Sequence, residues 1–261
     1  MEDKKLNYLT YPPVGKCIYC GVTQNLEVEH ILPFGLSGTA TLPESTCRAC
    51  AQITGKCEQD VLHGPMWAVR VYRDLKSRTK HKDAPAEYPV KILKDGRESD
   101  LQMPIEEVPI LLSFPLFTPP AFFSPAEYEH GIRVTGVITI SFGITPEEAA
   151  RKLGAEKIIL NQNIQPVAFA RLIAKIAFAW AAAEGKLSLL KEASPVVPAI
   201  LGRVDNIGRW VGTTEPLAKY GGVLHRLLIH EDRINRVLIG EVQLFSDSQT
   251  PSYGVVLGEM Q

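Results

Sequence analysis

Residues 17–57 read CIYCGVTQNLEVEHILPFGLSGTATLPESTCRACAQITGKC, and they contain all five cysteines of a chain of 261 residues. Four of these form two pairs, Cys17-Ile-Tyr-Cys20 and Cys47-Arg-Ala-Cys50. Two such knuckles on a chain that folds back on itself supply the four ligands of a tetrahedral zinc ion. Two disulfides or a thioredoxin-like redox pair are the alternatives, and the matched spacing favours structural zinc. Cys57 lies outside the pattern and is expected to be a small buried side chain.

The segment between the two pairs carries the candidate reactive groups. Residues 26–31 alternate as in a β-strand, which predicts that Glu29 and His30 point to opposite faces. Pro33 then begins a loop that contains glycines. After the second pair, residues 48–62 have helical spacing, and His63 is expected to cap the C-terminus of this helix.

The order of these motifs resembles the zinc-ribbon type of HNH endonuclease, whose core is a ββα-metal unit. The resemblance covers about residues 12–63, and the amino-acid sequence of these motifs is similar to that of a bacterial subgroup of the family with a long C-terminal extension. It implies a metal-dependent endonuclease that hydrolyses phosphodiester bonds in DNA and leaves 5′-phosphate and 3′-hydroxyl ends. His30 would be the general base that activates water, and Glu29 would bind a catalytic Mg²⁺ or Mn²⁺. Defence against foreign DNA is a setting that this subgroup suggests.

Two positions depart from the family pattern. Ala51 stands where the family usually has a metal-binding Asn or His, and residues 41–45 contain no Asn to orient the histidine. Glu58, two turns further on the same helix face, is the favoured replacement ligand, and Thr54 between them is the alternative. These departures motivate a second hypothesis, a catalytically degenerate zinc-ribbon module that binds nucleic acid.

A basic segment follows the cysteine-bearing region. Its six basic residues are Arg70, Arg73, Lys76, Arg78, Lys80 and Lys82, and one Asp opposes them. The whole chain has 28 basic and 29 acidic residues, a net charge of −1, which does not exclude such a local patch. We expect the patch to bind nucleic-acid phosphates beside the active site, with a solvated charged linker as the alternative reading.

The sequence divides into an HNH module at 1–65, the basic connecting segment at 66–84 and a larger domain of unknown role at 85–261. In the last region strands are predicted at 108–112, 132–142, 157–160, 237–245 and 253–257, and helices at 145–153, 165–184 and 205–211. The predicted fold class is therefore α+β, a small ββα-metal module followed by a larger α+β domain.

The apolar segment 167–183, within the helix predicted at 165–184, is interrupted by Arg171 and Lys175. It is therefore expected to be a buried helix rather than a membrane span. The two charges, four residues apart, are expected to form buried or peripheral ion pairs, with contact to phosphates as the alternative. The composition, 45% hydrophobic and 22% charged, and the absence of an apolar leader predict a soluble, cytoplasmic protein. An HNH unit has one active site, so cutting both strands would favour a homodimer or require two visits by one molecule.

Overall fold

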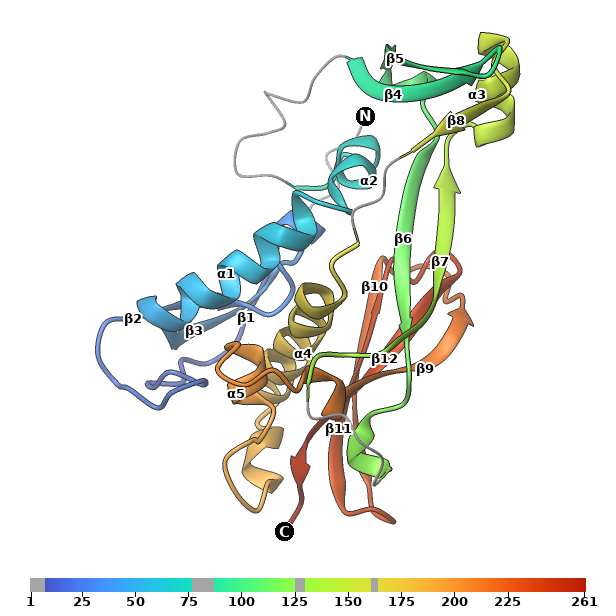
Figure 1. The fold of residues 1–261 in the computed structure, drawn as a ribbon. Coiled ribbons are helices and arrows are strands. Elements are labelled where there is room, and N and C mark those ends of the chain that lie inside the picture. The colour runs from blue at the N-terminus through green and yellow to red at the C-terminus, as the bar shows by residue number, and fades with distance from the viewer. Residues whose placement is uncertain (1–7, 77–86, 125–129, 161–163) are drawn as a thin grey trace.

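The computed structural model describes residues 8–76, 87–124, 130–160 and 164–261. It contains both helices and strands, which confirms the α+β class. A long central helix, α4 (Pro166–Ala183), lies between the N-terminal region on one side and an antiparallel sheet on the other (Figure 1). The N-terminal region is therefore packed directly on the element that organises the rest of the chain.

The N-terminal region contains a small sheet followed at once by a helix. Its strands are β1 (Leu9–Thr10), β2 (Leu26–His30) and β3 (Ala40–Cys47), in the order β1-β3-β2. The antiparallel strands β2 and β3 are joined by a loop that contains the short turn η1 (Phe34–Leu36). Helix α1 (Arg48–Leu62) starts directly after β3, and His63 is its C-terminal cap, as the sequence predicted.

An arm projects from the main body of the protein, at the top of Figure 1. After α2 (Trp67–Tyr72), the chain forms a sheet of order β5-β4-β8, with β4 at Glu87–Lys94, β5 at Arg97–Pro104 and β8 at Lys157–Ile159. Helix α3 (Pro146–Leu153) starts with a capping box between Thr145 and Glu148. The long antiparallel pair β6 (Ile110–Phe117) and β7 (Val134–Phe142) joins the arm to the main body; the short turns η2 (Ile105–Glu107) and η3 (Ala121–Phe123) flank β6.

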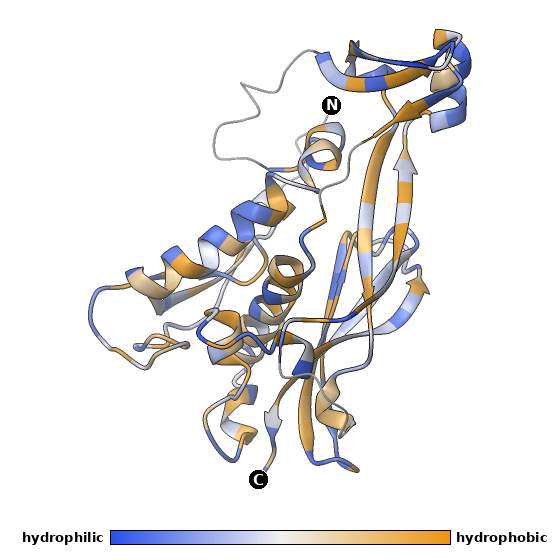
Figure 2. Ribbon diagram, in the orientation of Figure 1, coloured by the Kyte–Doolittle hydropathy of each residue, from blue (hydrophilic) through white to orange (hydrophobic). Residues whose placement is uncertain are grey.

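The main core lies between α4 and a four-stranded antiparallel sheet of order β10-β11-β12-β9. The strands are β9 (Val211–Ala218), β10 (His225–Asp232), β11 (Val237–Leu244) and β12 (Thr250–Glu259), and the short elements η4 (Lys186–Leu189), α5 (Val197–Ile200) and η5 (Ile207–Arg209) link α4 to this sheet. Figure 2 shows α4 and β6 as largely apolar. Gly240 on β11 allows close packing, because a Cβ there would lie 2.7 Å from the Cβ of Ala177.

One hydrophobic core extends through both regions. Buried residues of α1, including Cys57 and Val61, belong to the same cluster as Phe169 and Ile173 of α4. Helix α4 is long and apolar enough to span a membrane by length and composition, but most of its side chains are buried in this core. The apolar sequence of α4 is thus accounted for by packing on both faces, as expected for residues 165–184.

Most of the strands and helices predicted for residues 85–261 are present, with shifted ends. The helix predicted at 205–211 is wrong, because only the single turn η5 forms there before β9 begins. Strands β4, β5, β9 and β10 were not predicted. In β5 the polar residues that begin Arg97–Pro104 hide the apolar alternation that signals a strand. In β4 the alternation is present, since Val90 and Ile92 are buried and Lys91 between them is exposed, so this strand could have been predicted.

Candidate functional site

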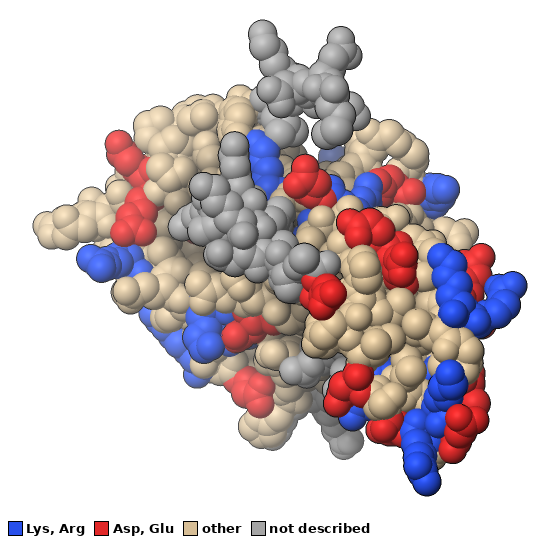
Figure 3. All heavy atoms as spheres, turned by 90° about the horizontal axis from the view of Figure 1, so that it is seen from above, with Lys and Arg blue, Asp and Glu red and all other residues tan. Residues whose placement is uncertain are grey.

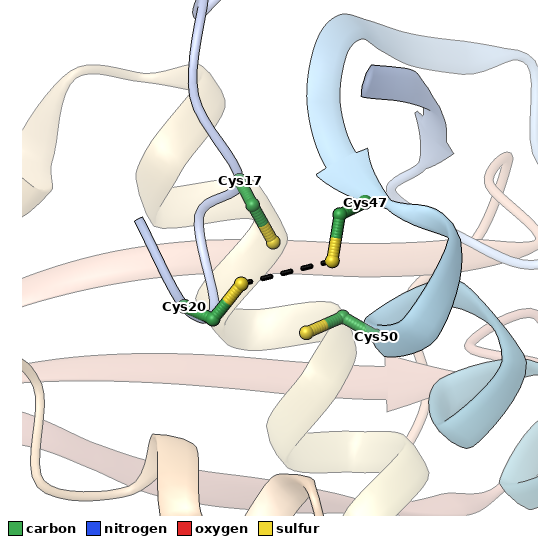
Figure 4. Close-up of side chains that lie close together, drawn as sticks. All are labelled: Cys17, Cys20, Cys47 and Cys50. Carbon is green, nitrogen blue, oxygen red and sulfur yellow. Dashed lines mark hydrogen bonds between the residues drawn. The ribbon is translucent and has the colours of Figure 1, made fainter. Parts of the chain in front are cut away.

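The four paired cysteines come together in space. Cys17 and Cys20 lie in the loop before β2, whereas Cys47 ends β3 and Cys50 lies in the first turn of α1. Their Sγ atoms all lie within 4.8 Å of one another and point to a common centre (Figure 4). A tetrahedron with Zn–S bonds of about 2.3 Å has S–S edges of about 3.8 Å, and the Sγ atoms of Cys20 and Cys47 are 3.6 Å apart. The cluster can therefore hold a metal ion such as zinc.

The electrostatics of the cluster also favour a bound cation. Burial acts against ionisation of Cys17, but backbone hydrogen bonds, led by that of Cys47, outweigh it and lower its pKa to about 7. Burial and the neighbouring thiols raise the pKa of Cys50. Four thiolates this close therefore need a cation to remain ionised together. Cys57 is not part of the cluster, since it is buried and its thiol donates to the carbonyl of Ala168 at 3.0 Å, in line with the prediction.

A groove of about 330 Å³ lies between β2 and α1, beside the cysteine cluster. It is bordered by Glu29 and His30 from β2 and by Ala51, Thr54 and Glu58 from α1, among others. All the residues singled out as catalytic or metal-binding candidates beside the cysteines thus meet in one place. The hydroxyl of Thr54 donates to the carbonyl of Cys50 at 3.2 Å, so it bonds within its own helix.

The side chain of Glu29 on β2 is buried. Only 5% of Glu29 is exposed, whereas 52% of its apolar neighbour Val28 is exposed. A register shift between Glu27 and Glu29 in the pairing of β2 with β3 interrupts the simple alternation. Glu29 and His30 pair in regular succession with Leu42 and Thr41, and both nevertheless border the groove, so the predicted opposite faces do not separate them at the site.

Lys175 of α4 explains the burial of Glu29. Its Nζ lies 2.5 Å from Oε1 of Glu29, 2.8 Å from Oε1 of Glu58 and 2.5 Å from the carbonyl oxygen of His30. Burial disfavours the ammonium, but the two carboxylates raise the pKa of Lys175 above its usual value. The ion pair expected for Lys175 is therefore confirmed, but its acidic partners are the two carboxylates assigned to the metal.

The catalytic divalent ion implied by the resemblance does not fit these residues. Mg²⁺ requires close octahedral oxygen ligands and keeps several waters, whereas Glu29 is buried and Lys175 already lies between the two carboxylates. Ala51 has no side-chain ligand to add. The cation between Glu29 and Glu58 is supplied by the protein itself.

The predicted phosphate-binding residues have mixed outcomes. The prediction that Arg70 binds phosphate is wrong, because its side chain is buried and donates to the carbonyls of Gly35 at 2.7 Å and Leu62 at 2.9 Å. Arg73 forms a bidentate ion pair with Asp247, at 2.5 and 3.1 Å. Lys76 donates to the hydroxyl of Tyr8. Arg78, Lys80 and Lys82 lie outside the described residues.

The face shown in Figure 3 has charged side chains of both signs. Viewed from above in Figure 3, Lys and Arg side chains alternate with Asp and Glu side chains over the arm formed by β4, β5 and α3. This face therefore presents no single-sign patch among the described residues. A phosphate-binding surface remains a prediction that rests on Lys76 and on the segment that follows it.

Comparison of the chain with protein-family models, with curated proteins and with solved structures finds no match. Function is therefore inferred from two features of the fold, the four-cysteine cluster and the adjoining groove. Sequence reasoning located both of them but missed Lys175 as the ion-pair partner of Glu29 and Glu58. A lysine in the middle of an apolar helix was the available signal, because such a charge needs a buried partner.

Proposed function

We propose that this chain is an HNH-type endonuclease that hydrolyses phosphodiester bonds in DNA in the groove between β2 and α1. The observation that carries the proposal is that His30 and Glu58 border one open groove beside the cluster of four cysteines. Zinc bound by these cysteines would have a structural role, holding the loop before β2 against the start of α1. Imidazole suits the work of a general base because its usual pKa lies near neutrality.

The proposed reaction uses His30 to take a proton from water. The water oxygen forms a bond to phosphorus, and the bond from phosphorus to the 3′ oxygen breaks. The 3′ oxygen leaves with the electron pair and takes a proton from solvent, so the products are a 5′-phosphate and a 3′-hydroxyl. His30 returns its proton to solvent at the end of the cycle.

A plasmid-nicking assay tests this proposal with zinc-loaded protein. Replacing His30 with Ala should reduce the cleavage rate by about 100-fold or more, as expected for loss of a general base. Replacing His63, which caps α1 outside the groove, with Ala is the matched control and should retain activity. Absence of cleavage of double-stranded DNA, single-stranded DNA and RNA, with and without Mg²⁺ or Mn²⁺, would overturn the proposal.

The second candidate is a zinc-ribbon module that binds nucleic acid without cutting it. Its specific support is the lack of a ligand at Ala51 together with Lys175 between Glu29 and Glu58. A gel-shift measurement on the same protein separates the two functions. Tight binding to DNA that is unchanged by His30→Ala, with no cleavage by either protein, supports the module over the enzyme.

A further inference from the structure

Lys175, from a distant part of the sequence, lies behind the groove and contacts Glu29 and Glu58, two of the residues that border it. It lies in the middle of α4, and α1 packs against α4, so the ammonium reaches the two carboxylates from behind the groove. Its side chain is 3% exposed, that of Glu29 is 6% exposed and that of Glu58 is 23% exposed. The cation is thus buried, while one of its two carboxylates still reaches solvent.

These contacts occupy all the N–H donors of the Lys175 ammonium. A lysine has three N–H donors, and Nζ has three oxygen partners, one from each carboxylate and one from the backbone of His30. Withdrawal of the side chain would leave a charge in the apolar core around Ala174 and Ile176. The ammonium is therefore held in place by satisfied hydrogen bonds on one side and by apolar packing on the other.

We propose that Lys175 takes the position of a divalent cation between Glu29 and Glu58, so that the groove binds no Mg²⁺ or Mn²⁺ through this pair. The inference rests on the proposed function in treating the groove as the active site. A divalent ion beside the ammonium would be repelled by its charge and would have to compete for the same two carboxylate oxygens. Any activity in this groove proceeds without a metal ion on Glu29 and Glu58.

Mn²⁺ binding, followed by electron paramagnetic resonance on zinc-loaded protein, tests the inference without requiring cleavage. The wild-type chain should show no stoichiometric site. Replacing Lys175 with Met frees both carboxylates, and this variant should bind one Mn²⁺ at least about tenfold more tightly than the wild type. The double variant Glu29→Gln with Lys175→Met is the control. It has the same net charge as the wild type but lacks one of the two carboxylates, so it should not gain this site.

A wild-type Mn²⁺ site that disappears in Glu58→Gln would overturn the inference, and this comparison remains decisive if Lys175→Met fails to fold. A folded Lys175→Met protein that gains no Mn²⁺ site would also overturn it. These outcomes can be told apart from those of the proposed function. If the chain binds no Mn²⁺ and cuts no nucleic acid, the inference about Lys175 stands and the proposed endonuclease activity fails. If cleavage depends on Mn²⁺ bound by Glu58, the endonuclease activity stands and the inference about Lys175 fails.

Discussion

Lowering the pH from 7 to 5 should destabilise the folded chain through one buried histidine, His225, at the start of β10. Its Nε2 donates to the carbonyl of Leu36, 2.8 Å away, and its Nδ1 accepts from the backbone N–H of Phe245 at 3.2 Å. Both ring nitrogens are satisfied in the neutral form, and a proton on Nδ1 would face another donor. Burial, opposed by the carbonyl of Leu36, lowers the pKa of His225 to about 4.

The size of the effect follows from proton linkage. In the unfolded chain a histidine has a pKa of about 6.5. Between this value and the folded value the unfolded state binds a proton that the folded state does not, so stability is lost as the pH falls through that window. The loss between pH 7 and pH 5 is roughly 2 kcal/mol, and it approaches a limit of roughly 3.4 kcal/mol below the folded pKa.

Urea unfolding followed by circular dichroism at pH 7, 6 and 5 measures this contribution. Replacing His225 with Gln keeps a donor for the Leu36 carbonyl and removes the titration, so the variant should lose less stability than the wild type over this range. Equal pH dependence in the wild type and in His225→Gln would refute the reasoning, as would a His225 ring that titrates near its ordinary pKa by NMR.

Three further predictions concern the metal, a buried arginine and a close helix–sheet contact. Replacing Cys47 with Ser, or removing the metal with a chelator, should lower the thermal unfolding temperature by about 10 °C or more, and added zinc should restore only the chelated protein. Replacing Arg70 with Met should destabilise the chain by about 2–4 kcal/mol in urea, because the buried carbonyl of Leu62 and the partly buried carbonyl of Gly35 lose their donor. The salt dependence of DNA binding should not change, and a weaker salt dependence would restore Arg70 as a phosphate ligand. Replacing Gly240 with Ala should cost about 1–3 kcal/mol, since its Cβ would meet that of Ala177 at 2.7 Å, and an unchanged urea midpoint would contradict this packing.

The features that were predictable depend on short-range chemistry. The two Cys-x-x-Cys knuckles, the capping box of α3 and the apolar period of α4 each lie within a few turns of chain. Spacing alone therefore indicated a four-cysteine cluster and the helix after it. The same local reasoning failed for β5, because its first four residues are polar and exposed and show no apolar period. For β4 the period was available, in the alternation of buried Val90 and Ile92 with exposed Lys91.

The groove required information that spacing does not contain. The basic segment illustrates this limit. Arg70 and Arg73 lie in a run of basic residues typical of a phosphate-binding patch, but Arg70 donates to the carbonyls of Gly35 and Leu62 and Arg73 pairs with Asp247. The residue type alone does not tell whether a charged side chain is solvated or buried, because its neighbours in three dimensions decide which of the two it is.

Residues close in sequence thus specify the thiol cluster, the strand that carries His30 and the helix that carries Glu58. The charge between them comes from Lys175, more than a hundred residues later, through the packing of α4 against α1. Helical and strand periods report which side of an element is buried, but not which distant element covers it. A buried ammonium needs carboxylates and buried carboxylates need a cation, so the fold satisfied both groups by bringing together two parts of the chain that have no local relation.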